Sequence, residues 1–165
     1  MSPVEDKHTK AFFDALPNML KEMCLERATQ REVNSNPSSD FKSLGLAFVV
    51  AVLGRIEGHV ILDISRETAM GVTELIDGEP VDEFNELVKS SLCELINLIA
   101  GKGMTALHDE DEPYMQTTPI MIDGDNLMVK SFSQRELVWT EFESSQGIMR
   151  IYCSLETRTP MVSNS

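Results

Sequence analysis

Two polar side chains in an otherwise apolar segment, Glu94 and Asn97, are the best candidates for chemistry in this 165-residue chain. They lie in the run Ser90-Ser-Leu-Cys-Glu-Leu-Ile-Asn-Leu-Ile-Ala-Gly-Lys-Gly103, whose spacing is typical of a helix. Residues three apart in a helix project together from adjoining turns, so a carboxylate would stand beside an amide. Asparagine inside a helix costs roughly half a kcal/mol relative to alanine, a small cost that adds only slightly to the case for a role of Asn97.

The helix that carries this pair is predicted to run from about Asp82 to Ala100 and to stop at Gly101-Lys-Gly103. On a helical wheel its apolar face is formed by Phe84, Val88, Leu92, Leu95 and Ile99, flanked by Leu87, Ile96 and Leu98. The opposite face holds Glu83, Glu86, Ser90, Glu94, Asn97 and Gly101. A polar stripe of this kind is also what any surface helix displays, so the stripe alone assigns no function.

Other residue types with catalytic or metal-binding potential form no comparable pattern. The cysteines are widely spaced and lack a Cys-x-x-Cys pair, which favours buried free thiols at Cys24, Cys93 and Cys153. The histidines share no ligand-like spacing, which argues against a zinc site built from His8, His59 and His108. We therefore expect no metal or cofactor of the chain's own.

Charge and hydropathy limit the partners of the chain. Its 27 acidic and 14 basic residues leave a net charge of −13, and such a surface repels nucleic acid and anionic lipid. No apolar run reaches the roughly 18 residues that span a bilayer. The N-terminal Met-Ser-Pro-Val-Glu-Asp-Lys-His lacks the apolar core of a secretory signal. We expect a cytoplasmic protein with protein partners.

The order of elements predicts an α+β fold in a single domain over residues 1–156, followed by a disordered polar tail at 157–165. Three helices are predicted, at His8–Arg27 with Pro17 either kinking it or in its first turn, at Arg66–Ile76 with Ser65 as N-cap, and at Asp82–Ala100. Strands are predicted at Leu46–Leu53, His59–Ile64, Thr117–Ile122, Leu127–Phe132, Leu137–Phe142 and Ile148–Leu155, and a turn-rich connection at Asn34–Asp40. Glycine-containing links at residues 54–58 and 144–147 favour one hairpin between the first two strands and another between the last two. We expect an antiparallel-rich sheet with long helices packed on one face.

Over roughly residues 9–156 the chain resembles the CheX branch of the CheC/CheX/FliY chemotaxis phosphatases. Ser90, Glu94 and Asn97 match the family's signature in type and spacing, and Pro119 follows with one residue fewer than the signature has. Gly54-Arg-Ile-Glu-Gly-His-Val-Ile-Leu-Asp-Ile-Ser65 and Thr118-Pro-Ile-Met-Ile-Asp-Gly124 resemble two further family segments. The first helix has Leu25, not Asn, three residues after Glu22, so one site per chain is implied, as in CheX.

The resemblance implies a phosphatase that hydrolyses the aspartyl-phosphate of a CheY-like response regulator. Phosphoryl transfer from an activated acyl phosphate depends on positioning and charge, so a water must be held in line with the leaving carboxylate. Asn97 would hold that water without adding charge, and Glu94 would dock to a lysine of the receiver. Mg²⁺ would belong to the receiver, and CheX-type proteins are expected to form homodimers through an extended sheet. Ser90 and Pro119 would be structural.

Two other readings remain open from the sequence. The same fold could bind a receiver or dimerise without hydrolysing anything, as a non-catalytic adaptor. An enzyme acting on small phosphate esters is disfavoured by the acidic surface and by the lack of a glycine-rich phosphate-binding loop.

Overall fold

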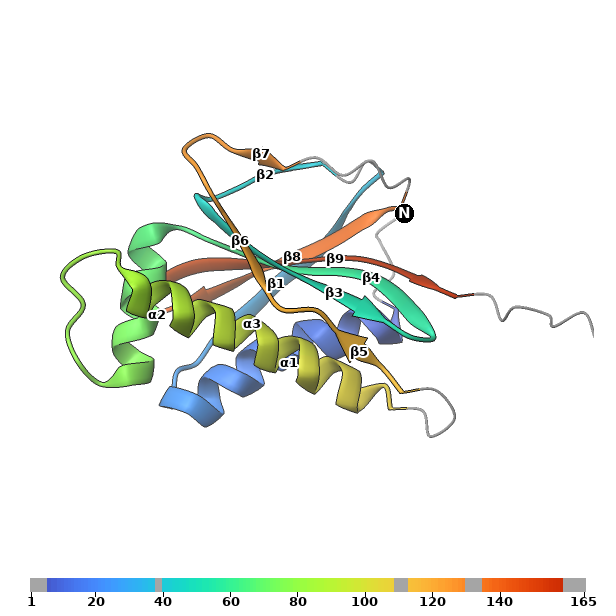
Figure 1. Cartoon of the computed structure of the whole chain (residues 1–165), viewed down its shortest axis with the longest axis horizontal. Helices are drawn as coiled ribbons and strands as arrows, with labels where there is room; N and C mark the ends of the chain where they lie inside the picture. Colours follow the sequence, from blue (N-terminus) through green and yellow to red (C-terminus); the bar gives the residue numbers. More distant parts are fainter. Residues whose placement is uncertain (1–5, 38–39, 109–112, 130–134, 159–165) are drawn as a thin grey trace, which may run out of the picture.

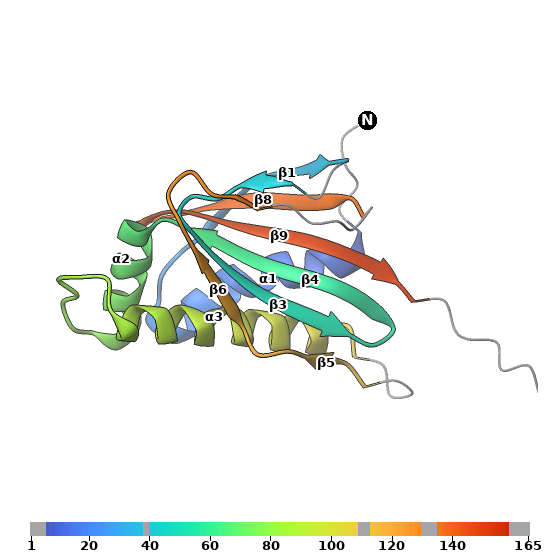
Figure 2. The same ribbon diagram turned by 45° about the horizontal axis from the view of Figure 1, so that its top comes forward.

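The computed structural model describes residues 6–37, 40–108, 113–129 and 135–158. Within these residues an antiparallel sheet carries the helices on one face (Figures 1 and 2). This is the α+β layout that the order of elements predicts. None of the helices in the described ranges is both long and apolar enough to cross a membrane.

The main sheet has the strand order β1-β8-β9-β4-β3-β5, and β6 also pairs with β3. Its strands are β1 (Thr29–Asn36), β3 (Leu46–Leu53), β4 (Ile56–Ile64), β5 (Met115–Gln116), β6 (Ile120–Asp123), β8 (Leu137–Ser144) and β9 (Gly147–Thr157). Two hairpins predicted from glycine-containing links, β3–β4 and β8–β9, are confirmed. Strand β1 was not predicted from the sequence. Its residues form an edge strand that pairs with β8.

Three helices pack against this sheet, two along its inner face and the shortest at one end (Figures 1 and 2). They are α1 (Lys7–Cys24), α2 (Arg66–Asp77) and α3 (Glu86–Ala106). The predicted N-cap of α2 is confirmed, because the Ser65 side chain accepts a hydrogen bond from the Thr68 amide. Helix α1 ends three residues earlier than predicted, since Leu25 adopts a left-handed conformation with φ of 59°. Pro17 lies inside α1 rather than in its first turn.

Helix α3 differs from its predicted bounds at both ends. It begins at Glu86, where the Asn85 side chain accepts a hydrogen bond from the Val88 amide, and it continues through Gly101 and Gly103. The two glycines do not end the helix because Gly103 lies where α3 packs against α1. A Cβ at position 103 would stand 2.3 Å from the Phe12 ring, so the glycine permits the close approach of the two helices.

The main core lies between the helices and the inner face of the sheet. Its largest fully buried members include Phe12, Phe13, Leu16, Leu20, Phe48, Leu62, Leu92, Leu95, Ile96 and Phe142. Burial of each such side chain stabilises the folded state by roughly 1.5–3 kcal/mol, compared with leaving that side chain exposed to water. This core holds α3 against β3 and leaves the other side of α3 toward solvent.

A smaller cluster covers part of the outer face of the sheet, a feature that the sequence does not predict. Strands β2 (Phe41–Lys42) and β7 (Met128–Val129) form a second, two-stranded sheet on that side (Figure 1). Phe41 stacks on Tyr152 with ring centroids 4.1 Å apart, and Tyr152 stacks on Trp139. This part of the outer face is therefore apolar and is covered by the small sheet.

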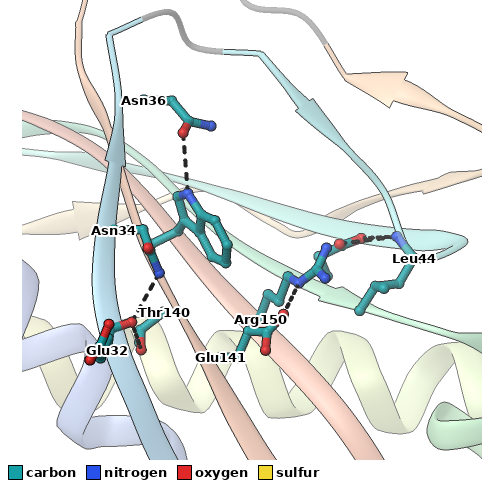
Figure 3. Close-up of polar contacts among 9 residues, drawn as sticks. Glu32, Asn34, Asn36, Leu44, Thr140, Glu141 and Arg150 are labelled. Carbon is teal, nitrogen blue, oxygen red and sulfur yellow. Dashed lines mark hydrogen bonds and ion pairs between the residues drawn. The ribbon is translucent and has the colours of Figure 1, made fainter.

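Asp63 is buried beneath this cover, with 0% of its surface exposed. Its carboxylate accepts one hydrogen bond from Ser43 Oγ at 2.6 Å and another from the Leu44 amide. Figure 3 shows the contact with Leu44. Arg150 donates to Glu141 nearby at 2.9 Å. Burial raises the pKa of Asp63, while the Ser43 and Leu44 hydrogen bonds oppose that rise.

The last strand extends into the segment predicted as a tail. Strand β9 ends at Thr157, and residues 159–165 lie outside the described ranges. The predicted strand at Leu127–Phe132 is represented by β7, and its residues from 130 on also lie outside these ranges.

Candidate active site

The candidate site lies on the solvent-facing side of α3. The opposite side of the helix is buried through Val88, Leu92, Leu95, Ile96, Ile99 and Ala100. Glu94 and Asn97 are therefore turned outward together, as the helical wheel predicts (Figure 2 shows α3 beneath the sheet). The structure brings this predicted pair to one surface.

Glu94 is exposed, and within the described residues its carboxylate makes no hydrogen bond or ion pair. The charges nearest along the chain are already paired: Lys89 contacts Glu86 at 2.9 Å, and Lys102 contacts Glu22 of α1 at 2.5 Å. An exposed and unpaired carboxylate is available to a cation on another molecule.

Asn97 is half-buried and is held by a residue from another element. Gln116 of β5 donates from Nε2 to Asn97 Oδ1 at 2.9 Å and to the Asn97 main-chain oxygen at 3.2 Å. The sequence gives no signal for this contact, because it depends on how the edge strand pairs with β3. Gln116 is thus a site residue that sequence reasoning missed.

The other two signature residues lie near the pair without forming part of the same polar group. Ser90 is exposed, and its hydroxyl donates to the main-chain oxygens of Glu86 and Leu87 in its own helix. Pro119 is half-buried between β5 and β6. Neither side chain contacts Glu94 or Asn97 among the bonds within the described residues.

Two leucines that the helical wheel places beside the apolar face of α3 lie on its outward side instead, so this part of the prediction is wrong. Leu87 is 48% exposed and Leu98 is 37% exposed. On the wheel they flank Glu94 because they stand seven residues before it and four residues after it. The outward side of α3 therefore combines a free carboxylate and an amide with apolar surface, a composition suited to contact with another protein.

Helix α1 does not repeat the Glu-x-x-Asn spacing of α3. Glu22 is paired with Lys102, and Leu25 is 88% exposed in a left-handed conformation that ends the helix. Residue 25 therefore lies beyond the last turn of α1 and does not continue the helical face that carries Glu22. The single pair on α3 agrees with one site per chain.

The remaining titratable and sulfur-containing residues are dispersed. His59 is exposed on β4, and partial burial of its ring together with the Arg135 charge lowers its pKa. Cys153 is buried, whereas Cys24 and Cys93 are only half-buried, and burial raises the pKa of both half-buried thiols. Across the described ranges no three metal-binding side chains gather.

A carboxylate and an amide on an exposed helix offer a limited chemistry. Neither is a good covalent nucleophile here, since no base lies within hydrogen-bond distance of them in the described residues. They can hold a water and bind a cation of a second molecule, and one carboxylate with one amide makes a poor metal cage. The arrangement therefore suits positioning within a complex.

The chain is similar to several chemotaxis proteins. The model of the family described as "Chemotaxis phosphatase CheX" matches residues 46–143. A "CheY-P phosphatase CheX" of Thermotoga maritima is 34% identical over 88 residues, which are 53% of this chain and 57% of that protein. The chain thus spans little more than half the length of this curated relative.

Solved structures share the fold. A CheX-CheY-BeF3-Mg²⁺ complex from Borrelia burgdorferi contains a chain 26% identical to this one with a TM-score of 0.73, and the match covers 90% of this chain and 97% of that one. A chemotaxis protein CheX from Desulfovibrio desulfuricans is 18% identical with a TM-score of 0.80, covering 93% of this chain and 100% of its own.

Proposed function

The chain belongs to the CheX family of chemotaxis phosphatases, and we propose that it hydrolyses the aspartyl-phosphate of a CheY-like response regulator. The observation that carries this proposal is the outward pair on α3, Glu94 and Asn97, at the surface that a second protein can reach. The relative from Thermotoga maritima is named for activity on phosphorylated CheY, which supports the same substrate here.

Asn97 is assigned to the attacking water. Its amide has both donor and acceptor atoms, so it can orient a water in line with the scissile bond. An amide also adds no charge beside the phosphoryl oxygens, whereas a carboxylate would repel them. Because the aspartyl-phosphate is already activated, positioning supplies most of the catalysis and a strong base is unnecessary.

Glu94 is assigned to docking. Its carboxylate is exposed and makes no ion pair within the described residues, so it is free to bind a lysine ammonium in the receiver's active site. That contact would align α3 so that Asn97 reaches the phosphorylated aspartate. Leu87 and Leu98 would supply apolar contact around it.

Magnesium would be held by the receiver and not by this chain. The complex from Borrelia burgdorferi contains Mg²⁺ and BeF3 together with CheY, which supports this division. Residues 1–156 would form one phosphatase domain working in the cytoplasm. Both ends of the main sheet carry an edge strand, β1 at one end and β5 with β6 at the other, so an extended sheet would join two copies in a homodimer.

The decay of a phosphorylated CheY-like receiver, followed with and without this protein, tests the function. We expect the wild type to accelerate decay, and Asn97→Ala to lower the accelerated rate by about 100-fold because the water loses its holder. Glu94→Ala should lose the acceleration too, and in addition it should weaken binding to the BeF3-loaded receiver by about tenfold or more.

Matched controls on exposed helix positions separate these roles from general effects. Glu86→Ala removes a carboxylate from the same helix, and Asn18→Ala removes an amide from α1; both should retain full rate and affinity. If wild type binds the phosphorylated receiver but leaves its rate of decay unchanged, the protein is a receiver-binding adaptor and not a phosphatase. Normal rate and affinity for Glu94→Ala would refute its docking role.

A further inference from the structure

The Asn97 amide is oriented by a second amide, that of Gln116. The two hydrogen bonds from Gln116 Nε2 reach Asn97 Oδ1 at 2.9 Å and the Asn97 main-chain oxygen at 3.2 Å. They join the edge strand β5 to α3, which lie beside each other in Figure 1. One NH2 group thus contacts both the backbone and the side chain of Asn97.

The main-chain contact decides the orientation of both amides. A backbone oxygen only accepts hydrogen bonds, so Gln116 must present its nitrogen to Asn97 rather than its oxygen. With that nitrogen in place, the Asn97 side chain must turn its own oxygen toward Gln116. The Asn97 NH2 group then faces outward, together with the second lone pair of Oδ1.

This orientation is kept at a cost. Gln116 Oε1 is buried and accepts no hydrogen bond within the described part of the chain. A buried oxygen without a hydrogen-bond donor has lost its hydration without compensation, which destabilises the folded state. Such groups are rare in folded proteins, and each one calls for an explanation. Here the unpaired end belongs to the same amide whose paired end holds Asn97.

A bulge in the edge strand points Gln116 at the helix. Gln116 faces Val52 of β3 and Ile120 faces Val49, so residues 117–119 lie opposite only residues 50–51. Because side chains alternate along a strand, the extra residue reverses the alternation across the bulge. Gln116 and, beyond the bulge, Met121 both lie on the helix side, opposite the buried Val52 and Phe48.

We infer that Gln116 is a positioning residue that fixes which end of the Asn97 amide meets a docked receiver. This inference rests on the proposed function, in which Asn97 holds the attacking water. Donation to Oδ1 polarises the amide and strengthens its outward N–H groups as donors. It also removes the alternative orientation, so Asn97 enters the receiver with one arrangement of donors and acceptors.

Two substitutions of Gln116 test this role by different means. Gln116→Met keeps the length of the side chain and removes both donors. Gln116→Glu keeps its shape but presents only acceptors at neutral pH, so it repels the Asn97 main-chain oxygen and favours the reversed amide. We expect single-turnover decay at saturating protein to slow by about tenfold to hundredfold in both variants, with Gln116→Glu the slower.

The affinity for the receiver distinguishes a positioning role from a merely structural one. Damage to the structure of the site would weaken binding as well as slow decay. The dissociation constant for the BeF3-loaded receiver should stay within about threefold of wild type, because Glu94 is untouched. Thr117→Val is the matched control. Thr117 lies next to Gln116 in the edge segment, but its Oγ1 accepts a hydrogen bond from the Ala51 amide of β3 and does not contact Asn97. It should retain the wild-type rate.

A second measurement needs no receiver. The Asn97 side-chain NH2 signals, identified by their loss in Asn97→Ala, should shift in Gln116→Met. The backbone amide signals of α3 should stay in place except next to the Asn97 main-chain oxygen, which also loses its bond from Gln116. If wild type does not accelerate decay, the proposed function fails. If wild type accelerates decay and both Gln116 variants match it in rate and leave the Asn97 signals unmoved, only the positioning role is refuted.

Discussion

Asn97 and Gln116 illustrate how much one side chain's behaviour depends on a neighbour from elsewhere in the chain. An isolated asparagine on a helix presents either end of its amide. The hydrogen bonds from Gln116 select one end, and they do so through a backbone oxygen that cannot change its role. The chemical identity of Asn97 is a property of the sequence, whereas its orientation is a property of the fold.

Asp63 is the residue whose ionisation should influence stability. Burial raises its pKa above the ordinary value of 3.8, so the folded state holds this proton more tightly than the unfolded state. Its contribution to the free energy of unfolding is therefore fully present below pH 3.8 and is lost as the pH rises through the raised pKa. The loss amounts to about 1.4 kcal/mol for each unit of elevation.

Asparagine does not titrate, so Asp63→Asn is the reference. We expect the free energy of unfolding of wild type, relative to that of Asp63→Asn, to fall as the pH rises from 3.8 through the raised pKa of Asp63, and then to level off. Urea unfolding at a series of pH values, followed by Trp139 fluorescence, measures the difference. Ser43→Ala removes a hydrogen bond that lowers the pKa of Asp63 and should move the fall to higher pH. Parallel curves for wild type and Asp63→Asn would contradict the burial effect.

At the scale of elements, the packing of α3 against α1 decides where the helix ends. Gly101 and Gly103 together resemble a termination signal, yet the helix continues to Ala106. Burial of the apolar side of α3 outweighs the propensity cost of two glycines, which is roughly 1 kcal/mol each. The glycines have different surroundings, and this difference can be measured.

Alanine at the two positions should have opposite effects on the free energy of unfolding. In Gly103→Ala the new Cβ would lie 2.3 Å from a ring carbon of the fully buried Phe12, so we expect a loss of about 1–3 kcal/mol from overpacking. In Gly101→Ala the nearest atom, Gln116 Oε1, is 3.8 Å away, an ordinary contact. That variant should gain up to about 1 kcal/mol from helix propensity.

Chemical unfolding of the two alanine variants beside wild type checks this contrast. Equal effects of the two substitutions would show that the contact with Phe12 does not limit the approach of α1 and α3.

At the scale of the whole molecule, one sheet joins nearly every element. Its inner face carries α1 and α3, and its outer face carries the small sheet of β2 and β7 (Figure 1). Strands from both halves of the chain alternate within it, since β1 pairs with β8 and β4 pairs with β9. Such interleaving leaves no boundary at which part of the chain could unfold alone.

Unfolding should therefore be a single transition. Trp139 fluorescence reports on the outer face of the sheet and circular dichroism reports mainly on the helices, so the two midpoints in urea should coincide. If two copies join through a sheet edge, the common midpoint should also rise with protein concentration. Separate midpoints would contradict a single domain over residues 1–156.

The local elements followed from sequence patterns for identifiable reasons. Ser65 and Gly78 mark the ends of α2 because a side-chain acceptor and a left-handed residue satisfy the helix termini. The hairpins of β3–β4 and β8–β9 followed from strands separated by glycine-containing turns. Strand β1 did not, because its residues are polar apart from Val33 and none of them is fully buried. It is a strand through its pairing with β8.

By itself, the sequence determined the outward pair on α3, because residues three apart on a helix with one apolar side must share the opposite face. It also determined the α+β layout and the resemblance to the CheX family. Only the tertiary structure decided the full length of α3, the exposure of Leu87 and Leu98, and the contact between Gln116 and Asn97. The physical reason is range: periodicity and capping act over a few residues, whereas these three features depend on contacts between segments that meet only in the folded chain.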